Sequence, residues 1–162
     1  MAMTSYMTLT GNNQGPIDGD CTQAGREATI LVYDVQHNIE IPRDTHTGLP
    51  TGQRIHHPLT ITKHLDVASP KLMQACTSGE KFSDVELHFY RIDPAGKEQL
   101  YYIIRLETAI IVNIRNYKPM TFLPENKPYQ DMEEVSFTYS KIIWTEVVAG
   151  VEAEDDWQTP KT

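Results

Sequence analysis

Cysteine, long apolar runs and positive charge are all scarce in this sequence. Its 162 residues include two cysteines, Cys21 and Cys76, which we expect to be free thiols. No window approaches the ~18 uninterrupted apolar residues of a membrane-spanning helix, so we expect no membrane insertion. Acidic residues outnumber basic ones by 22 to 14, giving a formal net charge of −8. Such a field repels a phosphate backbone, which argues against nucleic acid as a partner.

Two further absences concern targeting and catalysis. Residues 1–6 show no basic segment leading into an apolar one, so we expect a cytoplasmic chain that is exported, if at all, without a cleavable signal peptide. The sequence contains no Gly-x-Ser-x-Gly elbow, Walker loop, His-Glu-x-x-His or Cys-x-x-Cys pattern. We therefore expect neither an enzyme nor a cofactor.

Two short stretches invite a metal assignment, and both are weak. Residues 17–20 (Ile-Asp-Gly-Asp) lack the repeated Asp spacing and the later Glu of a calcium loop. His56 and His57 are neighbours on an expected strand, so their side chains point to opposite faces and cannot hold one ion together. The spacing of these residues predicts no metal site.

Alternating apolar and polar residues dominate what is present, and this period of two is typical of half-buried β-strands. Apolar odd positions from Leu31 to Ile41 predict one buried face, with His37 on it as a hydrogen-bonded structural residue. Lys63 interrupts the apolar face of another strand, and we expect its ammonium to reach water. The expected strands cover residues 4–10, 29–41, 57–67, 85–90, 99–115 and 135–144.

Changes of direction are also visible in the sequence. Residues 93–96 (Asp-Pro-Ala-Gly) have the chemistry of a hairpin turn. The long strand after that turn is expected to place Leu106, Ile110 and Val112 on one face. A switch of apolar phase near Lys141 predicts a bulge or bend in the last strand.

One helix is expected, from Pro70 to about Ser78. Ser69 is a suitable N-cap, proline suits the first helical position, and Gly79 suits the residue just past the end. The face that should pack on the sheet carries Leu72, Met73, Ala75 and Cys76.

The segment from Pro42 to Arg54 reads as a long polar loop with two prolines and two glycines. A plain surface connection is one interpretation, but ordered loops of this length are often binding elements. Residues 151–162 are expected to be an acidic solvated tail, in which Trp157 favours a partner surface.

Short motifs follow one another along almost the whole chain, from Tyr6 to Trp157. In this order and spacing they resemble the haemolysin-coregulated protein (Hcp) family, the tube subunits of bacterial type VI secretion systems. The motifs are Thr47-Gly48, Pro50-Thr51-Gly52-Gln53-Arg54, His56, Pro58, Thr62-Lys63, Asp66, Ser69-Pro70-x-Leu72, Phe89-Tyr90-Arg91, Tyr139-x-Lys141-Ile142-x-Trp144 and Asp155-Asp156-Trp157.

The resemblance implies a mainly β fold: a β-barrel of two crossing antiparallel sheets with one short flanking helix and a long protruding loop. It implies a single domain over residues 1–162, without an appended toxin. Six such chains would form a ring, and rings would stack into a hollow tube that carries small effector proteins. The implied partners are a contractile sheath, a spike protein and the effectors, and the tube itself would be secreted.

Within this framework we expect the contact between subunits or rings to lie in the long loop. The candidate residues are Arg43, Asp44, His46, Thr47, Leu49, Thr51, Gln53, Arg54 and His56. The polar strand face with Asp34 and Gln36 is our candidate for the lumen, although either polar face could line it. A monomeric barrel that binds a small apolar ligand is the alternative function.

Overall fold

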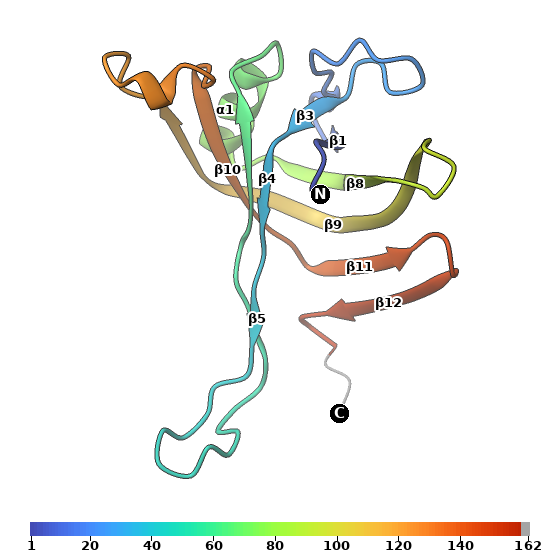
Figure 1. Cartoon of the computed structure of the whole chain (residues 1–162). Coiled ribbons are helices and arrows are strands. Elements are labelled where there is room, and N and C mark those ends of the chain that lie inside the picture. Colours follow the sequence, from blue (N-terminus) through green and yellow to red (C-terminus); the bar gives the residue numbers. More distant parts are fainter. Residues whose placement is uncertain (160–162) are drawn as a thin grey trace.

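The structure, a computed structural model, describes residues 1–159 as a curved β-sheet with one helix and a projecting arm (Figure 1). No helix in this part of the chain is long and apolar enough to cross a membrane. The helices are α1 (Ser69–Ser78) and a 3-10 turn, η1 (Pro124–Asn126). The strands are β1 (Ser5–Gly11), β2 (Gly15–Pro16), β3 (Ile30–Val32), β4 (Asp34–Gln36), β5 (Ile39–Glu40), β6 (Ile55–His56), β7 (Leu59–His64), β8 (Lys81–Ile92), β9 (Glu98–Tyr117), β10 (Met132–Thr138), β11 (Lys141–Glu146) and β12 (Val151–Asp156).

Ten strands pair antiparallel in the order β2-β1-β8-β9-β10-β7-β4, with β3 beside β1, and with β11 between β9 and β12. The 20-residue strand β9 holds β8 along one edge and both β11 and β10 along the other. The expected class, mainly β with one short helix and a long protruding loop, is confirmed. The pairing differs from two crossing sheets closed as a barrel: there is one large sheet, not closed, and a separate β5–β6 ribbon.

The core lies between the sheet and α1, which packs against β9. Each fully buried large apolar side chain there contributes roughly 1.5–3 kcal/mol. The predicted inward face of the helix is confirmed for three of its four residues, since Leu72 and Ala75 are buried and Cys76 packs at the edge of the core. Met73 is only half-buried and is not a member of the core cluster. Other fully buried members are Met7, Ile30, Leu59, Ile61, Phe82, Val85, Leu106, Val135, Phe137 and Ile142. Both cysteines are free, as predicted.

The ends of α1 follow the sequence signals with one change. Gly79 ends the helix with φ of 69°, a left-handed conformation that glycine adopts without strain. The residue before the first turn is Ala68 rather than Ser69. The chain is fixed there by Asp66, whose Oδ1 accepts the N–H of Ala68 at 3.0 Å, and by Ser69 Oγ, which accepts the N–H of Asp66 at 3.0 Å.

Two of the predicted strand phases are wrong. The expected strand over 29–41 is three strands, and Ile30 and Val32 are buried instead of Leu31 and Tyr33. The phase changes because β3 pairs with β1 whereas the next strand, β4, pairs with β7. An apolar run alone does not reveal that the chain changes neighbours at its midpoint.

The second wrong phase is in β9. Leu106 is buried as expected, but Ala109 and Ile111 follow it into the core, and Val112 is 50% exposed. Between them Thr108 has a positive φ of 53°, which breaks the alternation of the strand. The predicted turn between β8 and β9 is confirmed at Asp93, whose N–H bonds to Lys97 O.

The expectation that Lys63 reaches water is also wrong, because its side chain is fully buried. Its Nζ lies 2.8 Å from Glu133 Oε2 and 3.0 Å from Asp66 Oδ1, and it donates to His64 O. Both carboxylate side chains are fully buried too. A buried ammonium is tolerated here since two carboxylates compensate its charge.

The last part of the chain is more ordered than a solvated tail. Residues 151–156 form β12, which pairs along all of β11, so that expectation is wrong for this segment. Residues 160–162 lie outside the described part. The predicted bend near Lys141 is confirmed, since β10 ends at Thr138 and β11 begins at Lys141 on a different stretch of β9.

Candidate assembly site

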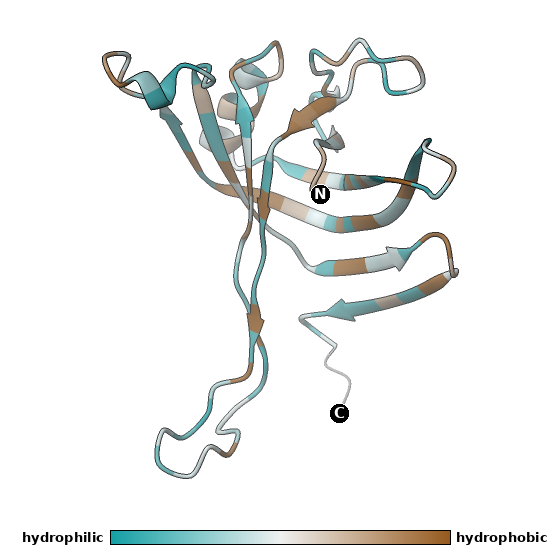
Figure 2. Ribbon diagram, in the orientation of Figure 1, coloured by the Kyte–Doolittle hydropathy of each residue, from teal (hydrophilic) through white to brown (hydrophobic). Residues whose placement is uncertain are grey.

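The long loop has structure of its own, and we call residues 39–56 the arm. Strands β5 and β6 pair at its base, and Arg43 forms an isolated bridge with Pro50 further out. The result is a narrow hairpin that extends far from the sheet (Figure 1). Its tip is mainly hydrophilic, whereas apolar residues mark β5 and the region near it (Figure 2).

Asp44 folds the tip of the arm. Its Oδ1 accepts the backbone N–H groups of His46 at 2.7 Å and Thr47 at 3.2 Å. The carbonyl oxygen of Asp44 accepts the N–H of Gly48 at 2.8 Å, and the N–H of Asp44 donates to Leu49 O at 2.9 Å. Aspartate closes tight turns in this way because its short carboxylate reaches the next amides. The tip is therefore shaped before any partner arrives, which lowers the entropy lost on binding.

Beyond its base the arm is exposed. Leu49 is 64% exposed at the tip, and Ile41 is 56% exposed along the shaft. A two-stranded ribbon is marginally stable alone in water, so exposed apolar side chains on it favour a covering surface. Six of the predicted contact residues are exposed here: Arg43, His46, Thr47, Leu49, Thr51 and Gln53.

The base of the arm is bound to the body by charge. Arg54 contacts Asp155 of β12 with two bonds, Nε to Oδ2 at 2.7 Å and Nη2 to Oδ1 at 3.0 Å. Its Nη2 also donates to Asp156 O at 2.7 Å. Such a bidentate pair fixes direction as well as distance. It therefore sets the angle at which the arm leaves the sheet.

His56 completes this attachment from the buried side. Its side chain is 1% exposed, its Nε2 lies 2.6 Å from Asp155 Oδ2, and its Nδ1 lies 2.7 Å from the hydroxyl of Tyr139. The ring of Trp157 lies over it at 5.1 Å between centroids. We call Arg54, His56, Tyr139, Asp155 and Trp157 the arm anchor.

The donor and acceptor roles in the anchor follow from which of these side chains can donate a hydrogen. Asp155 is an acceptor, so His56 donates from Nε2, and its Nδ1 forms a second hydrogen bond with the Tyr139 hydroxyl. The same hydroxyl is hydrogen-bonded to Nε2 of His37 at 2.7 Å. His37 is thus hydrogen-bonded, as predicted. His57 points away and lies 2.9 Å from Glu40, so the two neighbouring histidines do occupy opposite faces.

Neighbouring charges and burial shift the pKa values of these groups. The Arg54 guanidinium, helped by His56, holds the pKa of Asp155 below its usual range. Burial raises the pKa of Tyr139, and burial together with His56 and His57 lowers that of His37. At neutral pH the anchor therefore combines a carboxylate, a guanidinium and a neutral phenol.

The structure separates the nine predicted contact residues into two groups. Arg54 and His56 are bound within their own chain, and the other seven lie further out on the arm. The anchoring role of Asp155, Tyr139 and Trp157 was missed. They stood among the family motifs, but no sequence signal pairs Arg54 with a residue 101 positions away.

The two lumen candidates lie on β4, just before the arm. Asp34 and Gln36 are exposed on the same side, and Gln36 Nε2 donates to Asp34 Oδ2 at 2.9 Å. Across the ladder they face Thr62 and Thr60 of β7. Together they form a polar strip on the surface of the sheet.

Known proteins share this sequence and fold. The sequence profile "Type VI secretion system effector, Hcp" matches residues 6–145. The "Major exported protein" of Pseudomonas aeruginosa is 43% identical over 169 aligned residues, covering 99% of this chain and 98% of that protein. A crystal structure of an Hcp protein superposes with a TM-score of 0.90 at 30% identity, over 97% of this chain and 99% of that one.

A second solved structure agrees. The secreted protein Hcp3 of Pseudomonas aeruginosa has a TM-score of 0.77 at 40% identity and covers 94% of this chain and 99% of its own. The profile spans most of the sequence, and both close relatives align over nearly their full lengths. The chain therefore belongs to the Hcp family of type VI secretion system proteins.

Proposed function

We propose that this protein is the structural subunit of a type VI secretion tube. Hexameric rings stack into a hollow tube, which carries small effector proteins without a covalent link and is itself secreted when the machine fires. The sheath surrounds the tube and the spike protein caps it. Membership of the family supports the proposal, as does a relative named for its export.

The observation that carries the proposal is the preformed arm. A head-to-tail interface, in which one surface meets a different surface of the next subunit, closes a ring or continues as a stack. A projecting hairpin whose mainly hydrophilic tip carries one exposed apolar side chain, Leu49, suits such a contact, because it extends away from the body of its own chain. Leu49 would be the central apolar contact, flanked by the polar residues Arg43, His46, Thr47, Thr51 and Gln53.

Exposed sheet edges support assembly in the same way. In the described chain β12 pairs only with β11, and Val151 on it is 62% exposed. Open edges invite uncontrolled pairing unless something covers them. A neighbouring subunit would cover this edge in a closed ring.

Asp34 and Gln36 are the proposed lining of the lumen. They are exposed and polar, and they belong to a strand that precedes the arm. Replacing both with alanine is expected to leave ring size unchanged and to shorten the lifetime of a co-expressed effector. An unchanged effector lifetime would assign the lumen to another face.

The packing of residues 1–159 does not favour the alternative of a monomeric ligand-binding barrel. The interior is filled by the side chains of the core. A pocket of about 380 Å³ lies instead at the edge of the sheet, lined by Tyr33, Pro128, Tyr129, Gln130 and Met132.

Shortening the arm tests the proposal. Residues 44–49 are replaced by Asn-Gly, a two-residue turn that closes the hairpin at the Arg43–Pro50 bridge and spares the anchor. Tube formation by electron microscopy and secretion from cells should both be lost, while circular dichroism stays native. The matched control puts the conservative change Ala95→Ser into the exposed β8–β9 turn, and secretion should persist. Normal secretion by the shortened variant would refute a role for the arm in assembly.

A further inference from the structure

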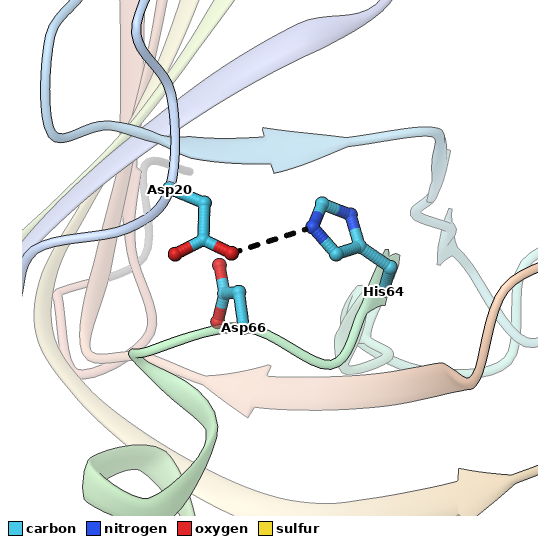
Figure 3. Close-up of side chains that lie close together, drawn as sticks. All are labelled: Asp20, His64 and Asp66. Atoms are coloured by element: carbon cyan, nitrogen blue, oxygen red, sulfur yellow. Dashed lines mark ion pairs between the residues drawn. The ribbon is translucent and has the colours of Figure 1, made fainter.

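We infer that Asp20, His64 and Asp66 form a binding site for a divalent transition-metal cation, with Zn²⁺ as the best-fitting ion. The three side chains converge from the loop after β2, the end of β7 and the segment before α1 (Figure 3). The site lies apart from the arm anchor, so it does not depend on the proposed function.

The distances suit a small cation. One donor atom from each side chain lies within 4.8 Å of the others, and His64 Nε2 is 3.7 Å from Asp20 Oδ2. Tetrahedral zinc with bonds of roughly 2.0–2.1 Å separates its ligands by about 3.3 Å. The Asp20 side chain is 40% exposed, and its Oδ2, the oxygen nearest His64, would move inward by a few tenths of an ångström, about 0.4 Å, to reach that spacing.

Asp66 supplies an independent observation. Its side chain is fully buried, and Oδ1 is occupied by Lys63 Nζ and by the N–H of Ala68. Its other oxygen, Oδ2, is buried without a hydrogen-bond partner in residues 1–159. Burying an unsatisfied carboxylate oxygen costs at least the ~1–3 kcal/mol of a neutral polar group. A bound cation would satisfy that oxygen.

The local charge favours the same conclusion. Lys63 is paired with two carboxylates, those of Asp66 and Glu133, and a third carboxylate, that of Asp20, lies beside Asp66 and His64. Three carboxylates against one ammonium leave an excess of two negative charges among these four groups. Glu133 Oε1 is also buried without a partner in the described chain, so Lys63 alone does not satisfy the cluster. One divalent ion would neutralise it.

His64 selects the kind of metal. Its Nδ1 lies 2.8 Å from the Tyr33 hydroxyl, and this contact holds the ring while leaving Nε2 directed at Asp20. A metal-binding histidine is typically oriented through its other nitrogen in this way. Imidazole is a ligand for zinc and its neighbours rather than for calcium or magnesium.

The ion would act as a structural clip. Asp20 already accepts a hydrogen bond from Val67 N at 3.3 Å, so the loop after β2 touches the start of the helix. A metal bridging Asp20 to His64 and Asp66 would fasten that loop to β7 and α1. Bound ions stabilise the folded state by mass action.

Calorimetry on the untagged, EDTA-treated full-length protein tests the inference. Zn²⁺ should bind at one ion per chain and raise the melting temperature, whereas Ca²⁺ should bind at least about tenfold more weakly. Asp20→Asn and His64→Gln should each weaken Zn²⁺ binding about tenfold or more. His57→Gln removes an exposed histidine far from the three ligands and should leave binding unchanged.

Several results would overturn the inference: no Zn²⁺ binding at roughly 1 mM, Zn²⁺ affinity in both ligand variants equal to that of the unmodified protein, or Ca²⁺ binding as tight as Zn²⁺. A readout on the unmodified protein guards against variants that fail to fold. In NMR spectra Zn²⁺ should shift the ring signals of His64 and not those of His57. Equal shifts of both rings would count against the site.

Discussion

At the scale of single residues, Lys63 is a fully buried charge that is paired with two buried carboxylates. Replacing it with Met keeps the length of the side chain but leaves Asp66 and Glu133 buried without their common counter-charge. We expect Lys63→Met to lower the free energy of unfolding by about 3–5 kcal/mol, as measured by urea denaturation at pH 7. The exposed Lys97→Met should change it by less than about 0.5 kcal/mol. A loss below about 1 kcal/mol for Lys63→Met would show that the charges are not paired as described.

Asp155 gives a residue-scale prediction with a definite pH dependence. Its pKa is lowered in the folded chain, mainly by Arg54. The contribution of ionised Asp155 to the free energy of unfolding is therefore fully present above the unfolded pKa of about 3.9. It is lost as the pH falls through the folded pKa. Asp155→Asn should cost about 2 kcal/mol of unfolding free energy at pH 7. The gap between the two proteins should close progressively below about pH 4. A gap that stayed constant down to pH 2 would contradict the assigned pairing.

The sequence predicts the environment of a residue only where that environment depends on residues nearby in the chain. The free cysteines, the hydrogen-bonded His37 and the opposite orientation of His56 and His57 follow from spacing alone. The partner of Lys63 does not, since Glu133 lies 70 positions away. A charge on an apolar face looks like a residue that reaches water until its partners are known.

At the scale of elements, the tip of the arm offers a matched pair of glycines. Gly48 has φ of 73°, whereas Gly52 has no positive φ, and an added Cβ at Gly52 meets only Pro42 at 3.9 Å. Gly48→Ala should strain the tip by about 1 kcal/mol and weaken assembly several-fold, because the contact residues would no longer be preformed. Gly52→Ala should leave assembly unchanged. The measurement is the concentration dependence of mass in sedimentation, and equal effects of both changes would contradict a preformed tip.

The helix and the hairpin turn were predictable because proline, glycine and aspartate mark them directly. The phases of β3 and β9 were not. In β9 the alternation is broken by Thr108, a β-branched residue with a positive φ, which no propensity would select. In β3 and β4 the change of pairing partner decides which side is buried, and pairing between distant strands is a tertiary property.

At the scale of the whole molecule, the mainly β class, the single helix and the protruding loop could be predicted, because period-two alternation fills the sequence outside one capped helix. The attachment of the arm could not, because it joins residues about 100 positions apart. The arm and its anchor have separate roles in this proposal. We propose that the anchor fixes the direction of the arm and that the exposed tip contacts a neighbouring subunit.

The mass of the particle in solution tests the central claim most directly. Light scattering on the full-length protein at micromolar concentration should give six chains of 18.4 kDa, about 110 kDa, and native mass spectrometry should give the same count. Leu49→Asp, which places a charge at the exposed tip of the arm, should reduce the assembled fraction without unfolding the chain. A stable particle of one chain for the unmodified protein would contradict the account.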